Sequence, residues 1–168
     1  MAIPIPAQCP SWDDLQWASS PFVRAASINQ PLDIPQSPNA PGLYMMTWHG
    51  VDGWRQLQKQ ITVKATVKVQ TPILDFASLT PPIVLTIGRT TAIRKRIRQH
   101  FGANHNNNRA LMRFRQLLPD LEIAALLDIV CNNVRIDWVR VDNWVHRCLL
   151  EKAGVCKTLP VFDLDAEH

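Results

Sequence analysis

Residues 83–101 read IVLTIGRTTAIRKRIRQHF, a stretch in which an uninterrupted apolar run gives way to a basic segment. The run from Ile83 to Ile87 has the length and the branched side chains of a strand buried on both faces, and Gly88 ends it. A helix should begin near Thr90 or Thr91, since threonine is a good capping residue. The apolar residues of that helix recur every fourth position: Ile93, Ile97 and Phe101. The stretch therefore predicts a central strand followed at once by an amphipathic helix.

Further strands and helices are predicted on both sides of this stretch. Pro41 and Gly42 introduce a bulky, aromatic run over 43–48 that is typical of a first strand. Residues 61–69 alternate strictly between apolar and polar, which predicts a strand with one buried face. The later patterns predict a helix after 106–108 that turns Leu111, Phe114 and Leu118 inward, followed by an apolar helix that ends near Cys131. They then predict a strand over 134–141 and a last helix from Asp142 or Asn143. This interleaved order predicts an α+β fold, with a small mixed or antiparallel sheet flanked by helices.

The N-terminal part differs in composition from the rest. Eight of the 13 prolines fall within residues 1–41, so long regular elements are not expected there. A short helix is expected at Ser11, because Ser11 and Asp14 have the spacing of a capping box. We interpret residues 1–40 as an arm that packs on a single domain, residues 41–168.

Composition narrows the class of protein further. A chain of 168 residues, 46% hydrophobic, is typical of a globular domain rather than a disordered or fibrous protein. No apolar run reaches the roughly 18 to 20 residues of a membrane-spanning helix, and the first residues lack the pattern of a signal peptide. The four cysteines form no CxxC pair, which fits reduced thiols better than a disulfide frame or a zinc site. We therefore expect a cytoplasmic protein without a membrane partner.

Positive charge is concentrated in one window of the chain. Between Arg89 and Arg115 there are eight Lys or Arg residues and no Asp or Glu, although the net charge is only +4. The other ten basic residues are outnumbered by all 14 acidic ones, so the remainder carries −4. Such asymmetry indicates a polyanionic partner, since phosphate contacts dominate affinity for nucleic acids. The alternative is a solvated helix face that is merely basic.

The order of the motifs resembles that of the GIY-YIG nuclease family. Gly42-Leu43-Tyr44 and Thr86-Ile87-Gly88 stand in the places of the two triplets, Arg96 follows Thr86 by ten positions, and His100 follows Arg96 by four. Glu151 and the stretch 159–163 resemble the closing part of the family's domain, so that the resemblance spans about residues 41–164. It implies an endonuclease that hydrolyses phosphodiester bonds in DNA with the help of a divalent metal ion.

By this resemblance, four residues would form the catalytic site. Tyr44 would take a proton from the attacking water, and His100 would hold that proton or contact a phosphate. Arg96 would bind phosphate oxygens through its planar guanidinium. Glu151 would bind one divalent cation, Mg²⁺ or Mn²⁺. The arrangement requires Glu151 to lie on the same side of the sheet as Tyr44 and Arg96.

Three features depart from the family's pattern. Thr86 stands where the second triplet has a tyrosine, so that phenol is missing. Asp163 stands where an asparagine is expected near the end and adds a negative charge there. The segment of about residues 49–82 is an insertion that contains the strand expected over 61–69, where the family has a short hairpin. Thr86, Asp163 and His105 are uncertain members of the active site.

Basic residues of the charged window are assigned to backbone phosphates rather than to bases, because most protein–DNA hydrogen bonds go to the backbone. These are Arg89, Arg94, Lys95, Arg98, Arg109 and Arg113. DNA is the expected partner, with RNA as the alternative nucleic acid. A double-strand cutter would need a homodimer or two successive nicks, because one active site holds one phosphate.

Two other functions fit the same residues. Thr86 and Asp163 would suit a DNA-binding module on the same fold that has lost catalysis. A small protein-interaction domain, on which the basic helix is incidental, would be favoured if DNA did not bind at low salt. Each catalytic residue also has a structural interpretation: a tyrosine on a strand face, an arginine or glutamate on a solvated helix, or a half-buried histidine.

Overall fold

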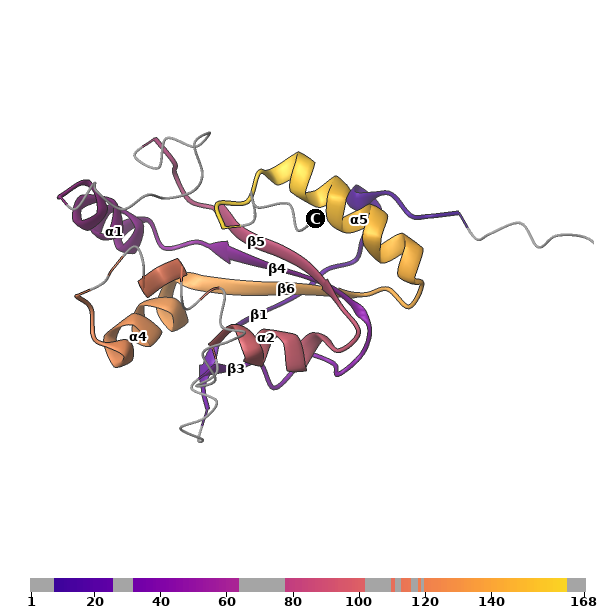
Figure 1. Cartoon of the computed structure of the whole chain (residues 1–168), viewed down its shortest axis with the longest axis horizontal. Coiled ribbons are helices and arrows are strands. Elements are labelled where there is room, and N and C mark those ends of the chain that lie inside the picture. Colours follow the sequence, from indigo (N-terminus) through magenta and orange to yellow (C-terminus); the bar gives the residue numbers. More distant parts are fainter. Residues whose placement is uncertain are drawn as a thin grey trace, which may run out of the picture.

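Four antiparallel strands form the central sheet (Figure 1). The structure, a computed structural model, describes residues 8–25, 32–63, 78–101, 110, 113–115, 118 and 120–162, with the side chains of 51–63 only as far as residue 59. The strands lie in the order β1 (Ala18–Pro21), β6 (Val134–Arg140), β4 (Gly42–Trp48) and β5 (Ile83–Thr90). All three pairings are antiparallel. With its helices, the chain has the predicted α+β fold, and the sheet is antiparallel rather than mixed.

Helices and a small second sheet surround the central one. The helices are α1 (Val51–Val63), α2 (Ile93–Phe101), α4 (Ile123–Asn133) and α5 (Trp144–Thr158). The antiparallel pair β2 (Val23–Arg24) and β3 (Leu32–Asp33) forms the second sheet, and η1 (Trp12–Asp14) is a single 3₁₀ turn. Within the described ranges, no helix combines the length and the apolar character needed to cross a membrane.

The strand and helix predicted over 83–101 are confirmed by β5 and α2, whose apolar stripe is buried. Their bounds need correction, because β5 continues through Gly88 to Thr90 and α2 begins at Ile93. The other predicted strands at 43–48 and 134–141 are confirmed by β4 and β6, and the predicted last helix by α5. Asn143 caps α5, since its side chain accepts a hydrogen bond of 3.1 Å from the backbone N–H of His146. Phe114 and Leu118 are buried as expected, while the start of the helix predicted after 106–108 lies outside the described residues.

Three local expectations need correction. Residues 61–63, expected to open a strand, are the last residues of α1, while 64–69 lie outside the described residues. Ser11 does not cap a backbone N–H, because its hydroxyl donates to the Asp14 carboxylate at 2.6 Å and only a 3₁₀ turn follows. Part of the arm is also more than a covering layer, since β1 pairs with β6 and belongs to the central sheet.

The sheet separates two layers of side chains. Because side chains alternate along a strand, Tyr44, Met46 and Trp48 of β4 point into the larger core, which they share with α1, α2 and α4. Leu43 points to the other face, where it packs with Leu150 of α5 and with η1. Figure 1 accordingly shows α5 on one side of the sheet and α2 with β3 on the other. Residues on α2 and α5 therefore approach the sheet from opposite faces.

The edge of the sheet that β5 forms is covered over part of its length. β1 forms one edge by pairing with β6. At the other edge, the segment after α5 runs beside β5: the N–H of Val161 donates to the carbonyl of Val84 at 3.0 Å, and the N–H of Phe162 donates to that of Leu85 at 2.7 Å. The carbonyls of Val84 and Leu85 thus have backbone partners outside the sheet.

Candidate active site

Tyr44 and His100 form a hydrogen-bonded pair in the larger core. Tyr44 lies in the middle of β4, and His100 lies in the last turn of α2. The Tyr44 hydroxyl and Nε2 of His100 are 2.6 Å apart, and each residue is only 3% exposed. The contact joins two predicted catalytic residues that are 56 positions apart in the sequence. A phenol and an imidazole at this distance can share or pass one proton.

Gly88 leaves the space that the Tyr44 ring occupies. β4 and β5 pair so that Tyr44 and Gly88 stand directly opposite each other. A Cβ atom on residue 88 would lie 2.4 Å from the tyrosine hydroxyl and 2.5 Å from the ring carbon that bears it. Only glycine leaves room for the ring to cross the neighbouring strand, which explains the glycine of the second triplet.

Two further residues of the predicted site lie close to this pair. Arg96 is on α2 one turn before His100 and is half-buried, so the two side chains are neighbours on one side of the helix. Thr86 is buried and lies two residues before Gly88, which puts both on the same face of β5. The uncertain residue Thr86 thus belongs to the surroundings of Tyr44, although it provides a hydroxyl rather than a phenol.

Glu151 reaches the sheet from the opposite face, because it is carried by α5. One of its carboxylate oxygens accepts the backbone N–H of Arg89 at 3.0 Å, and the other is ion-paired with the Arg89 guanidinium. Arg89 is the residue after Gly88, on the strand at the edge of the sheet. Of the four predicted catalytic residues, Tyr44 and His100 meet on one face of the sheet, and Glu151 meets Arg89 at the adjacent edge.

The carboxylate of Glu151 was expected to hold a divalent cation. Both of its oxygens already accept hydrogen bonds from Arg89, and a guanidinium at contact distance repels a metal ion. In the part of the chain that the structure describes, no group of three or more His, Cys, Asp or Glu residues could hold a metal. As arranged, these residues do not fit Mg²⁺ or Mn²⁺, and Arg89 would have to leave Glu151 before the site could bind either ion.

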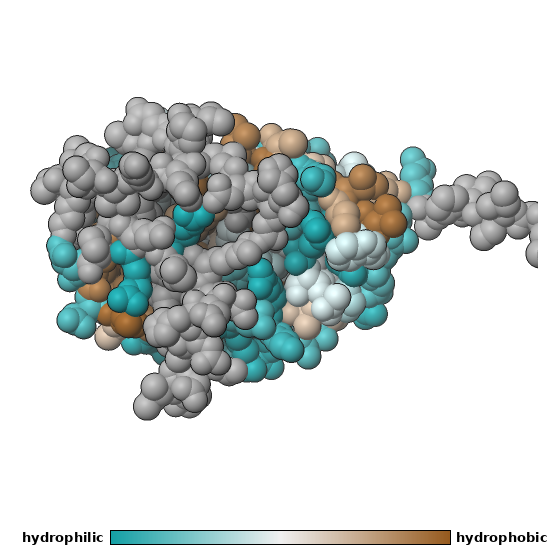
Figure 2. Space-filling model, in the orientation of Figure 1, coloured by the Kyte–Doolittle hydropathy of each residue, from teal (hydrophilic) through white to brown (hydrophobic). Residues whose placement is uncertain are grey.

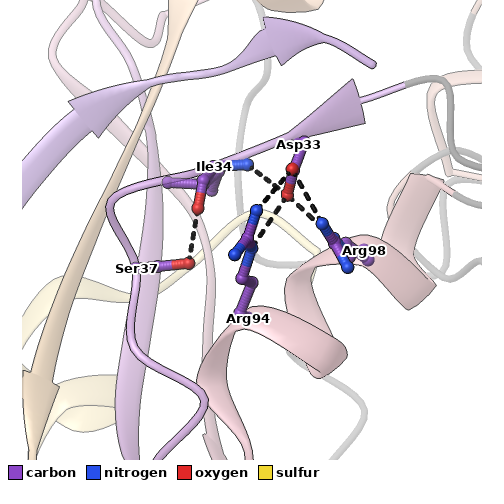
Figure 3. Close-up of polar contacts among 5 residues, drawn as sticks. All are labelled: Asp33, Ile34, Ser37, Arg94 and Arg98. Atoms are coloured by element: carbon purple, nitrogen blue, oxygen red, sulfur yellow. Dashed lines mark hydrogen bonds and ion pairs between the residues drawn. The ribbon is translucent and has the colours of Figure 1, made fainter. Parts of the chain in front are cut away.

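Two of the predicted phosphate-binding arginines have a carboxylate partner. Arg94 and Arg98 lie one turn apart on α2 and both direct their guanidinium groups at Asp33 of β3 (Figure 3). Each arginine bonds both oxygens, at 3.3 and 2.8 Å from Arg94 and at 2.8 Å twice from Arg98. The hydrogen bonds from Arg98 and Arg94 hold the pKa of the Asp33 carboxyl well below its usual range. This cluster fastens β3 to α2.

The position of this cluster separates it from the Tyr44–His100 pair. At about 100° per residue, Arg94 and Arg96 point about 160° apart around α2. Lys95 between them is exposed. Arg113 is half-buried and engaged in an interaction, whereas Arg109, His105 and Asp163 lie outside the described residues. The phosphate-binding role of all these residues stays a prediction.

Several contacts near the site join residues that no predicted motif connects. Asp33 lies 61 positions before Arg94 and comes from the arm, so no local pattern joins them. Trp144 lies against the guanidinium groups of Arg89 and Arg147, and neither Trp144 nor Arg147 is among the predicted site residues. The signal that existed was their helical spacing, since Trp144, Arg147 and Glu151 are three and four positions apart and share one side of α5.

Comparison of the chain with models of protein families, with curated proteins and with solved structures gave no match in any of the three cases.

Proposed function

We propose that the chain is an endonuclease that hydrolyses phosphodiester bonds in DNA with the GIY-YIG residues Tyr44, His100 and Arg96, and without the part expected of Glu151, which α5 carries to the other face of the sheet. The observation that carries the proposal is the hydrogen bond between Tyr44 and His100 above Gly88, with Arg96 one turn away on the same helix. The order of these residues in the sequence resembles the family's, and their contact in space is what a shared catalytic role requires.

Tyr44, His100 and Arg96 would have different roles in the hydrolysis. Hydrolysis begins when a water molecule attacks phosphorus, and the water must give up a proton. Tyr44 would accept that proton as its hydroxyl passes its own to Nε2 of His100, at the distance that the structure has. The bond from phosphorus to the leaving oxygen breaks at the same time, and that oxygen takes a proton from solvent. Arg96 would bind the phosphoryl oxygens on which negative charge increases, as a guanidinium does well.

The test is cleavage of supercoiled plasmid, with and without Mg²⁺ or Mn²⁺. The parent chain should nick or linearise the plasmid. Tyr44→Phe, which keeps the ring and removes only the hydroxyl, should cut it at a rate lower by a factor of about a hundred or more. Glu122→Gln is the surface control, because Glu122 is exposed and far along the chain from the site. Cutting by Tyr44→Phe at the parental rate would refute the proposed role of the pair.

A nucleic-acid-binding module without cleavage is the second candidate. It is favoured by the ion pair that occupies Glu151 and by Thr86 in the place of a phenol. In the same experiment this candidate predicts a shifted plasmid or oligonucleotide band in a gel, weaker as salt rises, with no cut product from the parent chain.

A further inference from the structure

Trp144 is exposed at the start of α5, unlike the other tryptophans. Of the six in the chain, Trp48, Trp54 and Trp138 are buried and Trp12 and Trp17 are half-buried, whereas Trp144 is 56% exposed. An indole left in water gives up the stabilisation that its burial would provide. Large exposed aromatic surface is a mark of a binding site.

Two guanidinium groups lie against this indole. The central carbon of Arg89, from β5, is 5.1 Å from the ring centroid, and that of Arg147, one turn further along α5, is 5.6 Å from it. Both distances are within the range of cation–π attraction. The two arginines therefore fix the position of the ring while more than half of Trp144 remains open to solvent.

Arg147 brings positive charge that no acidic side chain balances in the described part of the chain. It is 4% exposed, and one of its terminal nitrogens donates to the carbonyls of Val141 and Asp142 at 2.7 and 2.8 Å. Carbonyls satisfy hydrogen bonds but do not cancel a charge, and a buried unpaired charge is costly. The positive end of the α5 dipole adds to it. An anion beside Trp144 would supply the missing negative charge.

We propose that Trp144 is a stacking platform for an unpaired base of a nucleic acid, and that Arg147, whose charge no described acidic side chain balances, attracts the phosphate next to that base. The inference rests on the proposed function and deepens it. Arg89 connects Trp144 to Glu151, so the platform lies beside the predicted active site. The base must be unpaired, because in a duplex both faces of a base are already stacked on its neighbours. The preferred ligand is therefore single-stranded, or a duplex with a flipped or bulged nucleotide.

The arginines also favour a nucleotide over a protein partner. Apolar surface is visible over α5 in Figure 2, and Val145 and Leu149 are 58% and 54% exposed. A partner protein would bury these two residues together with Trp144, whereas a base needs the indole and the cations alone. The two readings predict different effects of Leu149→Ala, which serves as the matched control.

The experiment measures binding of a fluorescently labelled oligothymidylate, and of a duplex of equal length, by anisotropy at low salt. Trp144→Ala should weaken binding of the single strand about tenfold, and Trp144→Phe should retain most of the affinity. Leu149→Ala should bind like the parent, and the duplex should respond little to any of the three changes. Thermal unfolding of each variant confirms that the fold is kept.

If Trp144→Ala bound the single strand as tightly as the parent chain does, the proposed platform would be refuted. Equal losses of affinity for the single strand in Trp144→Ala and Leu149→Ala would also overturn it. A change of oligomeric state between the parent and Trp144→Ala, measured by sedimentation, would do the same, since either result would indicate a protein interface. If cleavage by the parent persists while Trp144→Ala binds normally, the platform fails and the proposed nuclease does not. If the parent binds neither nucleic acid, both fail.

Discussion

Arg89 engages both carboxylate oxygens of Glu151, one through its backbone N–H and one through its guanidinium. The backbone contact ties α5 to the edge strand β5, while the guanidinium places a positive charge where a cation would have to bind. The two contacts can be separated by mutation, because any residue at position 89 except proline retains the N–H.

Arg89→Ala should therefore bind Mn²⁺ more tightly than the parent, by about tenfold, because it removes one positive charge at contact distance from the carboxylate. Electron paramagnetic resonance of free Mn²⁺ measures this without reference to cleavage. Arg140→Ala is a matched control, since it breaks an exposed arginine–aspartate pair with Asp142. Equal Mn²⁺ affinity in the parent and Arg89→Ala would show that Arg89 does not compete with the metal.

Gly88→Ala should destabilise the fold by about 1–3 kcal/mol, because the added methyl group would overlap the Tyr44 ring, which lies against Gly88 and is hydrogen-bonded to His100. Chemical denaturation measures the free energy of unfolding. Gly53→Ala provides the comparison: its methyl group would meet the end of the Asn133 side chain, and alanine suits a helix better than glycine, here in the first turn of α1. A smaller loss for Gly88→Ala than for Gly53→Ala would contradict this account.

Asp33→Asn should lower the free energy of unfolding by about 1–3 kcal/mol at neutral pH, because both arginines then lose a charged acceptor. The pKa of Asp33 is lowered in the folded state, so its contribution is present above the unfolded-state pKa near 3.9 and is lost as pH falls towards the folded-state value. The difference between parent and variant should therefore shrink from pH 5 downwards in urea titrations. A difference that grows on acidification would have the wrong sign.

Lys95→Ala should weaken binding to DNA several-fold and reduce the slope of log affinity against log salt by about one, since Lys95 is exposed on α2. Arg94→Ala should instead act mainly on stability, because Arg94 is already bound to Asp33. Anisotropy titrations at several salt concentrations, run beside thermal unfolding, distinguish the two effects. If Arg94→Ala reduced the salt slope more than Lys95→Ala, Arg94 rather than Lys95 would be the phosphate contact.

Local patterns were sufficient to predict much of the sheet and its flanking helices. Ile93, Ile97 and Phe101 are spaced four positions apart, and this spacing determines which side of α2 is buried. His100 lies next to that side and therefore comes near Tyr44. The error at 61–63 has a physical origin, because Ile61, Thr62 and Val63 are β-branched and alternate in polarity, which favours a strand. The helical spacing of Val51, Trp54 and Leu57 just before them was the stronger signal, and Trp54 and Leu57 are buried accordingly.

The relations that escaped prediction are those between distant segments. Periodicity shows that Glu151 lies on a helix, but the face of the sheet that this helix covers depends on how the chain turns at 141–143. The choice of Asp33 as partner of Arg94 and Arg98 likewise depends on where the arm folds back. A charge count over the sequence could not reveal that three arginines of the basic window are ion-paired with acids outside it.

The hydrogen bonds from Val161 and Phe162 to β5, together with the carboxylate that accepts the N–H of Arg89, have a consequence for how other molecules can approach. A peptide cannot extend the sheet along these positions, because the main-chain groups that would receive an added strand are already satisfied. Recognition along these positions of β5 must therefore use side chains such as Trp144 beside Arg89, which leaves specificity to a few replaceable residues while the backbone stays unchanged.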